Sequence, residues 1–159
     1  MKKDADNHAA RIWIYSPEPA QTQEFRDILG DSGWDVAFGR CEADIWRALD
    51  ARAVDLMLLD LRDDELAGLE ILRRIRSLSD EQGIPLVAVA PAGVDVQAHL
   101  DAGAIDVVDK VTAANDMVPR IRAILGFKRR YEEHHLGRSE LAAVLLLSQQ
   151  RIEDLEMDN

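Results

Sequence analysis

Three apolar segments of this chain end in side chains that can do chemistry. Asp60 ends the run "VDLMLLD" and Lys110 follows "IDVVD". The stretch "WIYSPEP" at 13–19 supplies the hydroxyl of Ser16, the ring of Pro17 and the carboxylate of Glu18. A carboxylate can ligate a metal ion, and an ammonium can neutralise a carboxylate or a phosphate. The carboxyl ends of parallel strands meet at one edge of a sheet, so we expect these side chains to lie there together.

Runs that favour strands alternate with segments of helical spacing along most of the chain. We expect strands near 11–16, 34–38, 54–60, 84–91 and 105–110, and helices near 19–33, 41–52, 69–79, 93–104 and from 113 past 125. In the third helix the spacing places Leu69, Leu72, Ile75 and Leu78 on one face. Five strand–helix units predict an α/β fold, with a parallel sheet that helices cover on both faces.

Composition narrows the class of protein. The 159 residues are 47% hydrophobic and 31% charged, which suits one globular domain with an appendage. The net charge of −11 argues against binding to nucleic acid or to an anionic membrane surface, because both would repel the chain. No run reaches the ~18–20 apolar residues of a membrane span, and residues 1–10 lack the apolar core of a secretory signal, so we expect a cytoplasmic protein.

The sequence lacks the motifs of several common enzyme and cofactor sites. Cys41 is the single cysteine, which excludes an internal disulfide and a multi-cysteine metal site. No expected strand is followed by a G-x-G-x-x-G or a G-x-x-x-x-G-K-[ST] loop, and neither H-E-x-x-H nor G-x-S-x-G occurs. We therefore predict that the chain is not an enzyme and holds no cofactor.

The third strand and the residues after it resemble a known family. The segment "VDLMLLDLRDDELAGLEILRRIR" resembles the phosphoacceptor segment of bacterial response-regulator receiver domains, and "GAIDVVDKV" resembles the segment with that family's active-site lysine. The resemblance covers about residues 11–126 and places Asp60 on the phosphorylated aspartate and Lys110 on the lysine. It implies a (βα)5 flavodoxin-like fold, with a doubly wound parallel sheet in strand order 2-1-3-4-5.

The chain departs from the family's pattern at five supporting positions. The resemblance implies two adjacent acids that help to hold Mg²⁺, and Ser16 and Pro17 stand at these degenerate metal-acid positions. The switch positions, a Ser or Thr and an aromatic residue in the family, are occupied by Ala90 and Val107. The family's proline after the lysine is replaced by Val111, so we expect a trans peptide bond there.

Two functions follow from this pattern and stay open at this point. In the first, the chain is a degenerate receiver, or pseudo-receiver, in which Asp60 and Lys110 form an ion pair and signalling proceeds through protein contacts without phosphorylation. In the second, Asp60 is a true phosphoacceptor with non-standard metal binding, and Mg²⁺ is then the cofactor. A small effector in the vacated pocket is a third and weaker alternative.

The C-terminal segment has a different character from the rest of the chain. We expect a disordered tail at 1–10, a receiver-like domain at 11–126 and a helical extension at 127–159. The extension carries a heptad-like apolar stripe, which can fold back on the domain or pair with a second chain as a coiled coil. The residues that we assign to dimerisation are Leu141, Leu145, Ile152 and Leu155.

The partners we expect follow from these features. Homodimerisation through the extension comes first, and a signalling protein or a histidine kinase is the other candidate partner. The run "RRIR" at 73–76 predicts an exposed helix face that could meet an acidic partner. With no output domain after the extension, we expect either a stand-alone regulator or a chain cut before its output domain.

Overall fold

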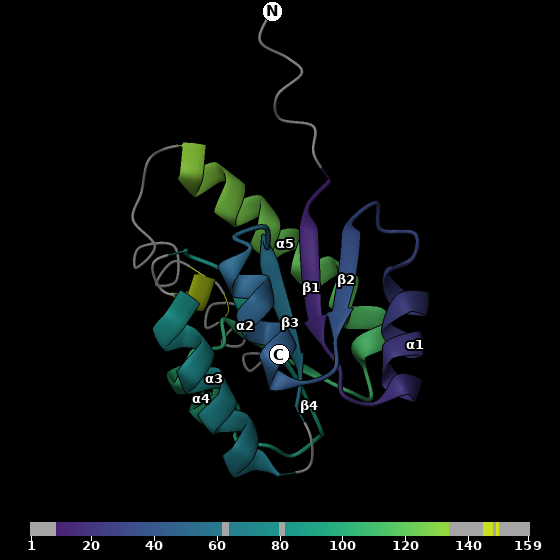
Figure 1. Ribbon diagram of the computed structural model, residues 1–159, viewed down its shortest axis with the longest axis vertical. Coiled ribbons are helices and arrows are strands. Elements are labelled where there is room, and N and C mark those ends of the chain that lie inside the picture. Colours follow the sequence, from purple (N-terminus) through teal and green to yellow (C-terminus); the bar gives the residue numbers. More distant parts are fainter. Residues whose placement is uncertain (1–8, 62–63, 80–81, 134–144, 148, 150–159) are drawn as a thin grey trace, which may run out of the picture.

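A parallel five-stranded sheet forms the centre of the molecule (Figure 1). The computed structural model describes residues 9–61, 64–79, 82–133, 145–147 and 149. The strands pair in the order β2-β1-β3-β4-β5, which confirms the predicted α/β flavodoxin-like topology. Their bounds are β1 Arg11–Tyr15, β2 Asp35–Gly39, β3 Leu56–Asp60, β4 Leu86–Ala90 and β5 Asp106–Asp109.

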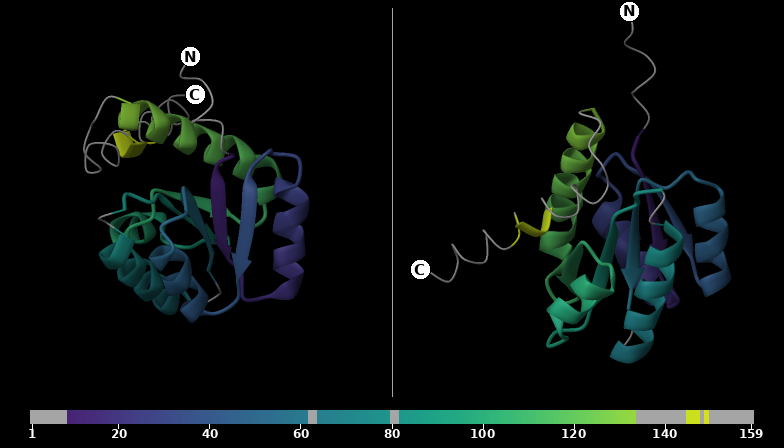
Figure 2. Two further views of the ribbon diagram at one scale, coloured as in Figure 1. Left: turned by 45° about the horizontal axis from the view of Figure 1, so that its top comes forward. Right: turned by 90° about the vertical axis from the view of Figure 1, so that its left-hand side faces the viewer.

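Five helices cover the two faces of the sheet (Figures 1 and 2). On one face Phe25 and Met117, from the first and last helices, pack against Ile14 of β1. On the other face Leu72 of the third helix packs in a second cluster with Met57 of β3. The bounds are α1 Pro19–Leu29, α2 Glu42–Asp50, α3 Glu65–Ser79, α4 Val96–Ala102 and α5 Ala113–Glu133.

Sequence and structure agree closely in the central strands and at one helix end. All five residues of β3 and all five of β4 are buried, which explains their nearly continuous apolar runs. Gly103 follows α4 with a φ of 129°, a region that favours glycine, so it ends this helix near the expected boundary at 104.

The inner face of α3 differs from the prediction in its last turn. Leu69, Leu72 and Ile75 are buried as expected. Leu78, however, is 60% exposed, and Ser79 takes the buried position instead. The buried residues are three apart up to Ile75 and four apart from Ile75 to Ser79. An α-helix has 3.6 residues per turn, so a constant spacing of three would turn the side chains away from the core.

Helix α5 runs without a break through the expected domain boundary at 126 and continues as far as Glu133, the last residue described in this part of the chain. Beyond Gly126, Lys128 is 9% exposed, and its Nζ donates to the carbonyl of Asp55 at 2.9 Å. Asp55 directly precedes β3, so this contact holds the end of α5 at the edge of the sheet where the strands begin (Figure 1).

The described part of the C-terminal segment lies on its own domain. Leu145 is 4% exposed and belongs to the cluster of α1 and α5, and the Nε2 of Gln149 donates to the carbonyl of Ile105 at 2.8 Å. Leu145 therefore packs on its own domain, as in the alternative in which the extension folds back, and does not pair with a second chain. The other assigned dimerisation residues, Leu141, Ile152 and Leu155, lie outside the described residues, as do residues 1–8 of the expected tail.

Among the helices described, none combines the length and the apolar character that crossing a bilayer demands.

Two glycines provide a matched test of this packing. A Cβ on Gly39, at the end of β2, would lie 2.6 Å from the Cβ of Asp44 and would overlap the ring of Trp13. A Cβ on Gly126, inside α5, meets nothing within 4 Å. We expect Gly39→Ala to lower the free energy of unfolding by about 1–3 kcal/mol through overpacking. Gly126→Ala should raise it by about 0.5–1 kcal/mol, because alanine favours a helix. Urea unfolding measures both, and equal shifts of the same sign would contradict this packing.

Candidate functional site

The predicted site residues meet at the carboxyl edge of the sheet. Asp60 is the last residue of β3, and Ser16 directly follows β1. Because Tyr15 pairs with Leu59, the next residues, Ser16 and Asp60, are neighbours across the two strands. From the other side, the backbone N–H of Lys110 donates to the carbonyl of Ala90 at 3.0 Å, which brings the ends of β4 and β5 to the same edge.

An ion pair dominates this edge. The Nζ of Lys110 lies 2.9 Å from Oδ1 of Asp60. The side chain of Asp60 is 2% exposed and that of Lys110 is 26% exposed, so the carboxylate is deep and the ammonium reaches it from the surface. Burying a carboxylate is costly unless a charge compensates it. Lys110 supplies that compensation, so this pair joins β3 to the end of β5.

Ser16 is fully buried and engaged with helix α1. Its backbone N–H donates to the carbonyl of Gly39 at 2.9 Å. Its Oγ lies 3.0 Å from Oγ1 of Thr22, and this threonine also lies 3.1 Å from the carbonyl of Glu18. The serine hydroxyl thus has a partner within the protein that ties β1 to the first turns of α1.

Thr22 is a residue that the sequence analysis missed. A signal for it exists, because Thr22, Phe25 and Leu29 follow helical spacing and all three are buried on the inner face of α1. A threonine on an apolar face needs a hydrogen-bond partner, and a serine at the end of the preceding strand is within reach.

The residues after Ser16 bring no second ligand to the edge. Pro17 is half-buried and has no donor atom in its side chain, and Glu18 is exposed where α1 begins. Mg²⁺ prefers several hard oxygen ligands in octahedral geometry. Among the residues that the structure describes, no group of three His, Cys, Asp or Glu side chains could hold a metal ion. With one carboxylate in an ion pair and one hydroxyl bonded to Thr22, the side chains that the structure describes at this edge do not supply the several oxygen ligands that Mg²⁺ prefers.

The remaining predicted positions lie near the edge without polar side chains. Ala90 is fully buried at the end of β4, and Val107 is half-buried in β5. The Lys110–Val111 peptide bond is trans, as expected, since the described residues include no cis bond. The N–H of Val111 donates to Oδ1 of Asp109 at 2.8 Å, a turn that a proline at this position could not form.

Two acids at the start of α3, Asp64 just before it and Glu65 as its first residue, accept hydrogen bonds from backbone N–H groups at helix starts. Oδ1 of Asp64 accepts from the N–H of Ala67 at 3.2 Å, in the first turn of α3. Oε1 of Glu65 accepts from the N–H of Asp95 at 2.9 Å, and Asp95 in turn caps α4. The contact between Glu65 and Asp95 joins the starts of α3 and α4, and it was not predicted from the sequence.

Comparisons with known proteins agree on one family. The model of the response regulator receiver domain family matches residues 12–122. The transcriptional regulatory protein TrcR of Mycobacterium tuberculosis is 29% identical over 121 residues, which are 76% of this chain and 47% of TrcR. The cyclic di-GMP phosphodiesterase response regulator RpfG of Xanthomonas campestris is 32% identical over 111 residues, 69% of this chain and 29% of RpfG. The chain thus spans about half or less of the length of these relatives.

Solved structures show the same fold. The receiver domain of the TMAO respiratory response regulator TorR has a TM-score of 0.63 at 24% identity and covers 73% of this chain and 96% of its own. A CheY-like receiver domain protein from Methanospirillum hungatei has a TM-score of 0.66 at 20% identity, with coverages of 77% and 98%.

The ion pair at this edge can be tested by removing one partner and then both. Lys110→Met leaves a buried carboxylate without its ammonium, so we expect the free energy of unfolding to fall by about 2–4 kcal/mol. The double variant Asp60→Asn with Lys110→Met should recover most of this loss, because no uncompensated charge remains. Denaturant unfolding measures both variants. A double variant as unstable as Lys110→Met would show that the pair does not neutralise Asp60.

Proposed function

The chain belongs to the response regulator receiver domain family, and we propose that it acts in two-component signalling as a degenerate receiver that works without phosphorylation. This proposal rests on one observation, which is that the side chains of Ser16, directly after β1, and of Asp60, at the end of β3, both already have partners within the protein. The carboxylate of Asp60 is held by Lys110 at 2.9 Å, and the hydroxyl of Ser16 is held by Thr22 at 3.0 Å.

The electrostatics of phosphoryl transfer support this proposal. A phosphoryl group that approaches a carboxylate brings one anion to another, and Mg²⁺ offsets the charge that builds up. The family motif has two acids for that ion where this chain has Ser16 and Pro17. A single neutral hydroxyl that already has a partner is a poor substitute for two carboxylates. Asp60 therefore has a structural role, as one half of an ion pair that joins two strands.

Without phosphotransfer, the function rests on protein contacts. We assign homodimerisation to residues 127–159, where the sequence places Leu141, Ile152 and Leu155 on one stripe. Support comes from α5, which is a continuous helix as far as Glu133. Its Lys128 donates to the carbonyl of Asp55 and so fixes this part of the helix on the domain. Leu147 is 63% exposed beyond it, so this segment presents apolar surface. A further signalling protein is the other partner we propose.

One observation favours a second function. Asp60 and Lys110 both occupy the positions of the family's phosphoacceptor and lysine, and they are in contact. In this alternative Asp60 accepts a phosphoryl group from a histidine kinase, and a metal ion binds with ligands other than the family's acid pair. The two functions make opposite predictions for a single chemical experiment.

Incubation with acetyl phosphate and Mg²⁺, followed by intact-protein mass spectrometry, distinguishes the two functions. We expect no gain in mass, because the phosphoryl group meets a carboxylate that lacks the metal ion. A receiver that retains both acids, treated in parallel, shows that the donor is active. A gain of one phosphoryl group that is absent from Asp60→Asn would overturn the proposal and establish the alternative.

A further inference from the structure

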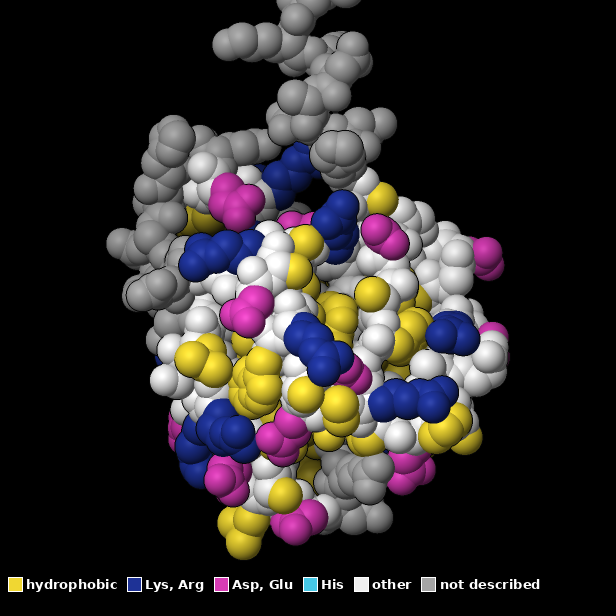
Figure 3. Space-filling model, viewed as in Figure 1, with side chains coloured by type: hydrophobic (Ala, Val, Ile, Leu, Met, Phe, Trp, Pro, Cys, Tyr) yellow, Lys and Arg dark blue, Asp and Glu magenta, His cyan; other side chains and the backbone are white. Residues whose placement is uncertain are grey.

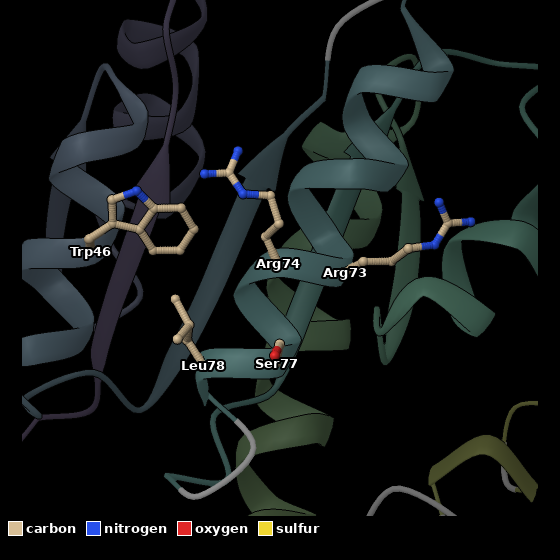
Figure 4. A pocket seen from close by; sticks show the side chains of 5 residues that line it. All are labelled: Trp46, Arg73, Arg74, Ser77 and Leu78. Carbon is tan, nitrogen blue, oxygen red and sulfur yellow. The ribbon is translucent and has the colours of Figure 1, made fainter.

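A hollow between α2 and α3 lies apart from the site at the strand ends. Its volume is about 550 Å³, and it is lined by Trp46, Arg73, Arg74, Ser77 and Leu78 (Figure 4). Because α3 starts just after β3 and runs back along the sheet, residues 73–78 lie in the half of α3 farther from Asp60. The function proposed above does not use this hollow.

The floor of the hollow is apolar and open to solvent. Leu78, 60% exposed, points toward the half-buried indole of Trp46 (Figure 4). Hydrophobic and basic side chains adjoin one another on the face over α2 and α3 (Figure 3). An exposed leucine beside an indole, bordered by charge, is the composition of a contact surface.

The rim of the hollow is basic and partly fixed in place. The guanidinium of Arg74 lies 5.3 Å from the centre of the Trp46 ring, and its Nη1 is 3.1 Å from Oε2 of Glu42. Arg74 is still 49% exposed, so donors remain for an incoming carboxylate. Arg73 extends from the opposite flank of α3 (Figure 4). Arg73 and Arg74 therefore lie on opposite flanks of α3, with Ser77 between them.

We propose that this hollow binds residues 152–158 of a second copy of the chain. That segment reads "IEDLEMD" and combines four acids and no base with three apolar side chains. Its leucine and isoleucine match the floor of Trp46 and Leu78, and its carboxylates match the arginines of the rim. The inference rests on the homodimerisation proposed above and names the surface that receives the extension.

Two further observations lead to the same pairing. Two chains with a net charge of −11 repel each other, so a contact between copies needs a place where opposite charges meet. In addition, Leu145 lies in the core of its own domain, so it does not contribute to a symmetric seam with Ile152 and Leu155. Reciprocal exchange of the segment 152–158 between two copies gives a closed dimer with two equal contacts.

Sedimentation equilibrium of the full chain tests the inference through charge reversal. Arg73→Glu with Arg74→Glu should weaken the dimer by about tenfold or more, since like charges then face each other. Glu153→Arg with Glu156→Arg, at the other side of the contact, should weaken it similarly. All four changes in one chain should restore association. Arg40→Glu with Arg52→Glu alters the net charge equally on exposed residues outside the hollow, and serves as the matched control.

The outcomes separate this inference from the proposed function. A wild-type chain that stays monomeric would overturn both the homodimer and the docking of 152–158. A wild-type dimer that is unaffected by Arg73→Glu with Arg74→Glu, or weakened no more than by the control, would overturn the docking alone. Loss of the dimer in both reversed pairs, with recovery in the fourfold variant, would establish it. If Arg73→Glu with Arg74→Glu acted by misfolding the domain, the further changes Glu153→Arg and Glu156→Arg would not restore the dimer.

Discussion

The compensation of one buried carboxylate organises the edge of the sheet that carries the site. Asp60 is 2% exposed at the end of β3, and its charge is stabilised by the ammonium of Lys110 at 2.9 Å. That contact requires β5 to end close to β3 with only β4 between them, which the strand order β2-β1-β3-β4-β5 provides. The fold and the ion pair therefore depend on each other. The parallel sheet brings the ends of its strands to one edge, and the ion pair offsets the cost of burying the Asp60 carboxylate there.

The same compensation is the basis of the function that we propose for this edge. In a receiver that holds Mg²⁺, a divalent ion and several oxygen ligands share the site with the aspartate. Here the singly charged ammonium of Lys110 contacts Asp60, and the neighbouring hydroxyl of Ser16 is hydrogen-bonded to Thr22. In our proposal a site of this kind keeps the strand ends together but lacks the charge that phosphoryl transfer needs. In our proposal the contacts that carry signalling are made by the α2–α3 hollow and by residues 127–159.

Much of the fold could be predicted from the sequence because local patterns set it directly. The runs of β3 and β4 and the glycine after α4 follow from burial on two faces and from backbone freedom. The site was predictable only in part. Asp60, Lys110 and Ser16 were found because each lies at the end of a strand or directly after one, whereas Thr22 and the Glu65–Asp95 contact depend on how helices pack against their neighbours. Leu78 was misplaced for a different reason, since a repeated spacing of three departs from the 3.6 residues of a helical turn and Ser79 takes the buried position.

The central claim is that Lys110, and not a metal ion, neutralises Asp60. Titration of the ¹⁵N-labelled chain with millimolar Mg²⁺, followed by ¹H–¹⁵N correlation spectra, tests this claim most directly. The account predicts no saturable shift in the amide signals of Leu61 and Lys110, which flank the site. Saturable shifts of these signals that disappear in Asp60→Asn would show that the carboxylate binds Mg²⁺, and would contradict the account.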